Sequence, residues 1–152
     1  MRVSAKADYA LRAACELASR EGAGPVKGDT IAQAQGIPLK FLENILLELR
    51  HAEIVQSQRG ERGGYWLARP PSDVTVAEVI RAVEGPLANV RGVRPEALEY
   101  GGAAASLRTV WVAVRASLRS VLEAVTLADV VAGSFPARVD ELVADPQAWE
   151  PH

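Results

Sequence analysis

The sequence predicts a mainly α-helical fold that contains one two-stranded β-hairpin. Three patterns in its 152 residues indicate this fold. Apolar residues repeat at helical spacing before residue 52, alternate with a period of two just after it, and repeat about every 3.5 residues in the second half. The length suits one domain, with or without a dimerising arm, and is sufficient to bury a core.

Three helices are expected before residue 52. Their predicted ranges are 4–20, 29–35 and 38–51, and Gly36 and Pro38 place a tight turn between the second and the third. Pro38 fits a helix start because the N–H that it lacks would have no helical partner there. The apolar stripes expected to face the core are Leu11, Ala14, Cys15 and Ala18; Ile31 and Ala34; and Leu42, Ile45, Leu46 and Leu49.

A β-hairpin is expected after the third helix, where the period changes to two. Its strands are predicted over 54–59 and 65–68, and the glycine-rich residues 60–64 join them. Glycine suits such a loop because it adopts positive φ without steric cost. Pro70 and Pro71 end the hairpin, since proline cannot continue a β-ladder.

The second half is expected to hold a capped helix, a long loop and a long helix. Thr75 and Glu78 have the spacing of a capping box at the start of a helix over 75–84. The long helix is predicted over 104–125, and Thr126 is expected to cap a short final helix that runs through Val131. The apolar seam of the long helix, which suits packing against another helix, comprises Leu107, Trp111, Val114, Leu118, Val121 and Val125.

These elements divide the chain into four segments. Residues 1–84 form the predicted N-terminal domain, and 85–103 form a weakly structured effector or linker loop, of a length that is uncommon in compact domains. Residues 104–132 form the dimerisation helix and the short final helix. Residues 133–152, which contain three prolines, are expected to be a tail of low order.

Composition excludes several classes of protein. No stretch approaches the roughly 18 apolar residues of a membrane span, and no apolar signal segment follows Met1. The single cysteine, Cys15, cannot form an internal disulfide, which favours the cytoplasm. One cysteine and two histidines are too few for a zinc site of that type, so no metal is expected.

Charge is divided unevenly along the chain, whose formal net charge is −2. Residues 1–70 carry ten basic and eight acidic side chains, whereas residues 71–152 carry seven and eleven. The first part is therefore the better suited to a polyanion, although an ordinary solvated surface would explain the same small excess.

The order of helix, short helix, turn, helix and hairpin is typical of a winged helix-turn-helix domain. In that fold the third helix projects into the major groove of DNA, which is about 12 Å wide. Lys40 lies near the helix end that usually meets base edges, Asn44 suits an adenine edge, and Glu43 can accept a hydrogen bond from cytosine. The predicted exposed face of this helix comprises Lys40, Glu43, Asn44, Glu48 and Arg50.

The predicted hairpin loop carries two arginines on a glycine-rich tip. Arg59 and Arg62 suit a narrow and electronegative minor groove. Gly60, Gly63 and Gly64 would let the backbone approach phosphates. The simpler interpretation is that the arginines only keep the loop soluble, with Glu61 reducing their field.

In combination, ten short motifs make the chain similar to the Rrf2 family of bacterial winged-helix regulators, which includes the IscR, NsrR and CymR types. The resemblance covers roughly residues 1–132, and the hairpin motif is its most distinctive part. The motifs are Met1–Ser4, Tyr9–Arg12, Gly24–Val26, Ile31–Ala32, Gln35–Pro38, Phe41–Glu43, Arg59–Gly60, Gly63–Leu67, Val79–Gly85 and Thr126–Val130.

The resemblance implies a homodimeric transcriptional regulator that binds a palindromic operator in double-stranded DNA, and we expect a repressor because the IscR, NsrR and CymR types are repressors. Lys40, Glu43 and Asn44 match the recognition-helix positions of the family, and Arg59 matches its wing arginine. Arg2, Ser4 and Lys6 would lie near phosphate at the start of the first helix.

The chain departs from the family in the loop where many members bind an iron–sulfur cluster through three cysteines. Residues 85–107 contain no cysteine, and a cluster needs thiolates, so we expect no cofactor. Cys15 remains a possible thiol sensor, although its place on an inner stripe favours a packing role. Alternatively, Tyr100, Arg91, Arg94 and Trp111 line a pocket for an anionic effector or pack the dimer.

Two other functional classes compete with DNA binding. A winged-helix protein-interaction module that does not read DNA is the main alternative, because Glu43 and Glu48 balance Lys40 on the third helix. An enzyme is disfavoured, since no nucleophile–base pair, phosphate-binding loop or paired carboxylates are recognisable.

Overall fold

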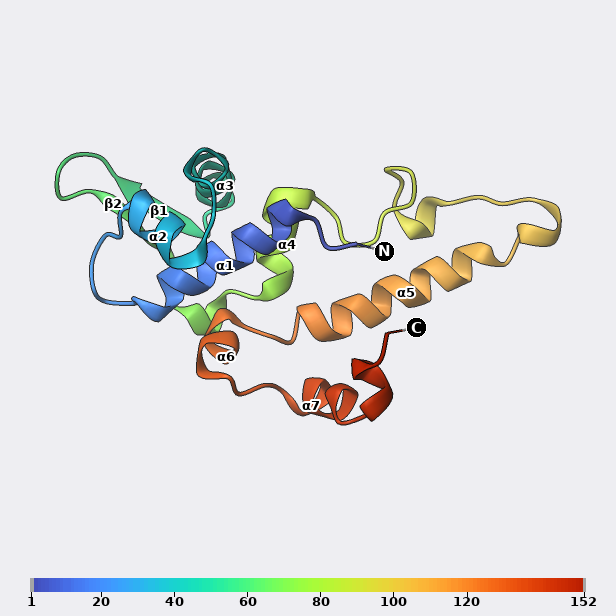
Figure 1. Ribbon diagram of the computed structural model, residues 1–152. Helices are drawn as coiled ribbons and strands as arrows, with labels where there is room; N and C mark the ends of the chain where they lie inside the picture. The colour runs from blue at the N-terminus through green and yellow to red at the C-terminus, as the bar shows by residue number, and fades with distance from the viewer. Residues whose placement is uncertain (1, 152) are drawn as a thin grey trace.

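The structure is a computed structural model that describes residues 2–151. It confirms a mainly helical fold with one antiparallel hairpin (Figure 1). The elements are α1 (Ala5–Ser19), α2 (Gly28–Gln35), α3 (Leu39–His51), β1 (Val55–Gln58), β2 (Gly64–Leu67), α4 (Val76–Glu84), α5 (Leu107–Leu122), α6 (Leu127–Ala132) and α7 (Ala137–Val143). Short 3-10 turns lie at Pro71–Asp73, Pro95–Ala97, Gly102–Ala104 and Pro146–Trp149.

Helix α1 lies at the centre of the core. It contacts α2, α3, α4, α6 and β2, and Figure 1 shows it running between α3 and α6. The small side chains of Ala10, Ala13 and Ala14 are completely buried, which lets several helices approach it closely. Leu11 and Cys15, expected on the inner stripe, are only half-buried because alanines occupy the middle of the buried face.

Helices α2 and α3 form the helix-turn-helix. Gly36 ends α2 in the left-handed conformation (φ 61°), and Ile37 of the same turn is buried. The predicted apolar face of α3, Leu42, Ile45, Leu46 and Leu49, is buried against the core. Ala34 is exposed, contrary to expectation, because Ile31, Ala32 and Ile37 already fill the contact between α2 and the core.

The hairpin depends on two glycines that tolerate no side chain. A Cβ atom at Gly63 would lie 2.1 Å from the carbonyl oxygen of Gln58, and one at Gly64 would lie 2.6 Å from that of Val26. The Val26 backbone pairs there with Tyr65 and holds the start of α2 to the sheet. Gly63 and Gly64 are both buried, so both have a structural role in the hairpin, and their approach to phosphates stays a prediction.

The chain returns to its N-terminal part after α5. The Val76 N–H donates to the Val125 carbonyl over 2.9 Å, and the Leu127 N–H donates to the Val74 carbonyl over 2.9 Å. Thr75 and Thr126, which these bonds bring together, each begin a helix with a complete capping box. Val125 is therefore buried in the body of the protein and lies outside α5, so its place in the predicted seam was wrong.

Helix α5 extends away from this body (Figure 1). It begins three residues later and ends three residues earlier than predicted, because a 3-10 turn precedes it and the return to Val74 follows it. None of its residues is buried, and the rest of the predicted seam, Leu107, Trp111, Val114, Leu118 and Val121, is half-buried.

Residues 133–151 contain helical structure, whereas a tail of low order was expected over 133–152. Pro136 occupies the N-cap of α7, and Pro146 begins a 3-10 turn. Proline is well tolerated at helix starts, so these prolines initiate helical turns here. No helix among residues 2–151 combines the length and the apolarity of a transmembrane segment.

Replacement of Gly63 by alanine is expected to destabilise the protein by about 1–3 kcal/mol, because the new methyl group would collide with a backbone carbonyl that cannot move freely. Urea denaturation of both proteins measures the difference. The matched control is Gly101→Ala, where the added Cβ atom would have no neighbour within 4 Å. Equal unfolding midpoints for G63A and the unmodified chain would contradict this account of the hairpin.

Candidate nucleic-acid interface

The outer face of α3 presents polar side chains at its N-terminal end. Lys40, Glu43 and Asn44 are all exposed, as predicted, and lie opposite the buried leucine face. Glu48 is half-buried, and Arg50 donates from Nη1 to Ser57 Oγ over 3.2 Å. The two ends of the helix therefore differ: the first two turns are free for contacts, and the last turn is tied to β1.

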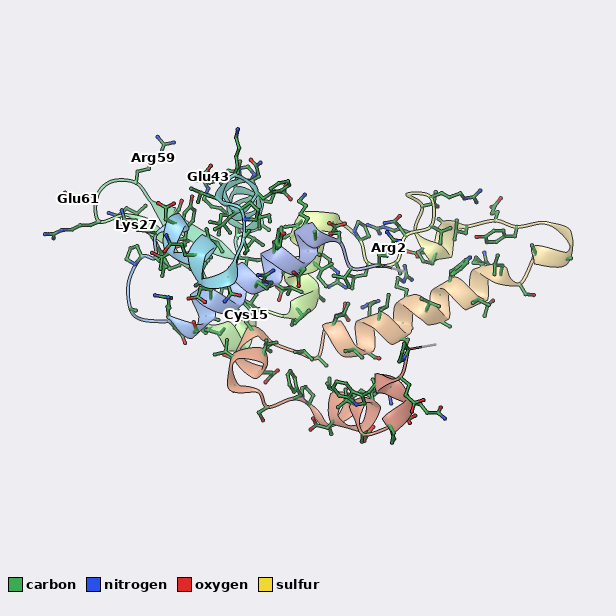
Figure 2. The ribbon with its side chains drawn as sticks, viewed as in Figure 1. Arg2, Cys15, Lys27, Glu43, Arg59 and Glu61 are labelled. Atoms are coloured by element: carbon green, nitrogen blue, oxygen red, sulfur yellow. The ribbon has the colours of Figure 1, made fainter. Side chains whose placement is uncertain are left out.

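The hairpin loop adds a second group of polar side chains. Arg59, Gly60, Glu61 and Arg62 are exposed, and Figure 2 shows Arg59 extending on the side of the molecule where Glu43 lies. We call the exposed residues of the two elements the α3–wing surface. It comprises Lys40, Glu43, Asn44, Arg59, Gly60 and Arg62.

Lys27 supports the loop and was not predicted to belong to the site. Its Nζ atom donates to the Gly60 carbonyl over 3.0 Å, which places an ammonium group beneath the tip of the hairpin (Figure 2). The two residues are 33 positions apart in the sequence. Local patterns therefore contain no signal for this contact, which depends on the pairing of Val26 with Tyr65.

Phe41 is a second residue that was not predicted to belong to the site. Its side chain is 62% exposed on α3, between Lys40 and the buried Leu42. Apolar periodicity assigns core positions and does not identify an aromatic ring that lies just outside the stripe. A large exposed ring at the start of such a helix can contact the methyl group of thymine.

Two of the three residues expected near phosphate at the start of α1 are engaged within the chain. Ser4 Oγ caps α1 by accepting from the Ala7 N–H over 3.0 Å, and it donates to Glu84. Lys6 Nζ donates to the Val83 carbonyl over 2.9 Å and forms an ion pair with Glu48 at 2.8 Å. One N–H of the Lys6 ammonium remains for another partner. Arg2 is exposed and makes no ion pair within residues 2–151.

The candidate sensor residues are not assembled into one site. Burial raises the pKa of the Cys15 thiol, which favours its protonated form. Trp111 Nε1 donates to the Tyr100 hydroxyl over 3.0 Å and so fastens the loop to α5, whereas Arg91 is exposed. Only Arg94 of the four predicted pocket residues lines a basic cavity, with partners that are described below.

Comparisons with known proteins agree with this geometry. Residues 3–133 match the sequence profile of the Rrf2 family, described as an iron-dependent transcriptional regulator. Rv1287 of Mycobacterium tuberculosis, named as a candidate HTH-type transcriptional regulator, is 49% identical over 150 residues, which cover 99% of this chain and 93% of that protein.

Solved structures of CymR and IscR regulators also resemble this chain. CymR of Bacillus subtilis, titled a global cysteine regulator, superposes with a TM-score of 0.75 at 34% identity, covering 88% of this chain and 98% of that one. IscR of T. potens superposes with a TM-score of 0.68 at 33% identity, covering 100% of this chain and 93% of that one.

The donor set does not fit an iron–sulfur cluster, despite the iron dependence named for the family. Cluster iron is bound by several thiolates, and this chain has one cysteine, which is half-buried in α1. Within residues 2–151, no three His, Cys, Asp or Glu side chains are grouped so that they could hold a metal ion. Glu96 and Glu99 of the loop supply carboxylates alone, which are poor substitutes for thiolates.

We expect protein purified under anaerobic conditions to contain neither stoichiometric iron nor acid-labile sulfide, because the chain lacks the thiolates that would bind them. Colorimetric iron and sulfide assays, together with the visible absorption spectrum, measure this. A Cys15→Ser variant is the control and should give the same result. One iron per chain with a sulfur-to-iron charge-transfer band would contradict this expectation.

Proposed function

Because this chain belongs to the Rrf2 family of transcriptional regulators, we propose that it binds double-stranded DNA sequence-specifically as a homodimer and represses transcription from a palindromic operator. The observation that carries this proposal is the α3–wing surface, where the free end of α3 and an arginine-bearing hairpin are exposed together. No iron–sulfur cluster takes part in the proposed mechanism.

We place the first two turns of α3 in the major groove. Asn44 can bind the adenine edge through two hydrogen bonds, and Glu43 can accept from the amino group of cytosine. Lys40 contributes charge at the end of the helix that enters the groove first. Phe41 is exposed beside these groups and suits a thymine methyl group. Together these side chains favour a mixed base sequence over a run of one base pair.

We place the hairpin loop on the adjacent minor groove or its phosphates. Arg59 and Arg62 are exposed on the loop, and Lys27 adds a third cation through its hydrogen bond to Gly60. Cations inserted there gain from the negative potential of a narrow groove. Glu61 on the same loop reduces the local positive charge, so the shape of the loop must contribute to DNA binding in addition to the attraction between its cations and the phosphates.

Helix α5 has no buried residue, which supports the proposal that a second copy of this chain packs against it. Its seam residues are half-buried, and Val110 on the same helix is 50% exposed. A two-fold dimer through α5 would cover this apolar side and would present two α3–wing surfaces. Two-fold protein symmetry predicts half-sites about one helical turn apart, and a dimer bound over a promoter would exclude RNA polymerase.

Selection of bound duplexes from genomic fragments tests the proposal directly. We expect an enriched inverted repeat, and we expect its affinity to fall steeply with salt because phosphate contacts release counterions. If the recovered fragments share no sequence, and a pulldown instead yields a stoichiometric protein partner, the winged fold serves as a protein-interaction module.

Arg59→Ala is expected to weaken operator binding about tenfold, because one charge-assisted contact to DNA is lost from an exposed position that stabilises nothing else. Fluorescence anisotropy with a labelled operator at fixed salt measures the change. Arg138→Ala is the matched control, since Arg138 lies on α7 and has only the adjacent Glu141 as a partner, at 3.9 Å. Equal losses in both variants would show that Arg59 acts only through net charge.

Leu118→Asp is expected to convert the dimer into a monomer, because a carboxylate would have to be buried between two apolar helices without a partner. Analytical ultracentrifugation gives the mass, and circular dichroism checks that the helices persist. The control is Ala116→Asp, at an exposed position on another side of α5. A folded L118D variant that still sediments as a dimer would place the interface elsewhere.

A further inference from the structure

Four arginine side chains surround one cavity between α4, the loop that follows it and α5. Arg81 comes from α4, Arg94 from the loop, and Arg115 and Arg119 from consecutive turns of α5. The cavity has a volume of about 480 Å³ and opens to solvent. Its remaining walls are Gly85, Pro86, Leu87 and Glu96. We call it the arginine cavity.

Positive charge exceeds negative charge in this cavity. Glu96 pairs with Arg115, and Glu123, which does not line the cavity, pairs with both Arg81 and Arg119. Two carboxylates therefore accompany four guanidinium groups. Each guanidinium has five N–H donors, so most donors are left without a protein acceptor. Arg94 forms no ion pair within the described part of the chain. The pKa of Glu96 is lowered mainly by a hydrogen bond from its own backbone, and the charges of Arg115 and Arg94 add to this effect.

We propose that the arginine cavity binds a small ligand through a doubly charged oxyanion group, either a phosphate or a dicarboxylate. Two negative charges match the net excess of two positive charges that remains after four guanidinium groups are set against two carboxylates. The planar guanidinium fork binds both kinds of oxyanion with paired hydrogen bonds. The volume falls in the range of small-molecule sites and leaves room for the rest of a metabolite beyond the anionic group.

The position of the cavity separates this ligand from DNA. The α3–wing surface belongs to α3 and the hairpin, whereas the arginine cavity is lined by residues of α4, the loop that follows it and α5. Glu123 joins Arg81 of α4 to Arg119 of α5, at 2.9 Å for the second pair. A bound oxyanion competes with Glu123 for both arginines and so changes how α5 is held against the body. This regulatory role rests on the proposed function, but ligand binding does not.

Isothermal titration of the full chain without DNA tests the proposal. The probes are inorganic phosphate and succinate, each at an ionic strength held constant with sodium chloride. We expect one of them to bind saturably, one per chain, with a Kd below about 1 mM. Phosphate binding identifies a phosphorylated ligand, and succinate binding identifies a dicarboxylate. No saturable heat from either probe overturns the proposal.

Arg94→Gln locates the site, because it removes a cavity charge without breaking an ion pair. We expect its affinity for the probe to fall at least about tenfold. Arg91→Gln, an equal charge change on the same loop but outside the cavity, is expected to bind like the unmodified chain. If R94Q does not fold, the same comparison is made with Arg94→Lys, which keeps the charge and loses the paired hydrogen bonds.

Two results would overturn the assignment to this cavity: equal losses for R94Q and R91Q, or loss of probe binding in Arg59→Ala with R94Q unaffected. The second result would place the anion on the α3–wing surface. Because these titrations contain no DNA, a chain that binds the probe but no operator would refute the proposed function while leaving the arginine cavity intact.

Discussion

The close packing around the alanine face of α1 is the constraint on which the rest of the structure depends. Ala10, Ala13 and Ala14 are completely buried where α1 meets its neighbouring helices, and each of them presents only a methyl group. This spacing sets the distance between α1 and α3, and thereby how far the outer side of α3 stands from the core. The same helix also packs against α4 and α6. The α3–wing surface and the segments to which α5 is attached therefore both depend on packing against α1.

Local periodicity was sufficient to predict the fold, because each element here carries its own signal. The leucine face of α3, the capping boxes at Thr75 and Thr126, and the glycines of the hairpin all act within a few residues. The errors arise where distant segments meet. The Val125 carbonyl accepts a hydrogen bond from the Val76 N–H, which holds Val125 in the body of the protein. Helical turns in the C-terminal segment begin at prolines, and proline is equally suited to a loop.

The sequence predicted which residues of the candidate site are exposed, but it did not predict the contacts that these residues make. Lys40, Glu43, Asn44 and Arg59 are exposed where a helix and a loop were expected to present them. The partners of Lys6, in contrast, lie 42 and 77 residues away in Glu48 and Val83, beyond the reach of any spacing rule. Glycine has two uses in the hairpin: it adopts backbone conformations that other residues rarely adopt, and it allows close packing. Only the tertiary structure shows that Gly60 is exposed whereas Gly63 and Gly64 are closely packed.

The backbone bonds that join residues 74–76 to residues 125–127 have an evolutionary consequence. They bring the two ends of the intervening segment together beside α4, which packs against α1, so residues 85–124 form an insertion that starts and ends on the body. Main-chain hydrogen bonds place few demands on side-chain identity. Such an insertion can change in length or chemistry while its junctions, and the part of the molecule that carries the α3–wing surface, stay the same. The architecture thus permits one N-terminal winged-helix part to be combined with different intervening segments over evolutionary time.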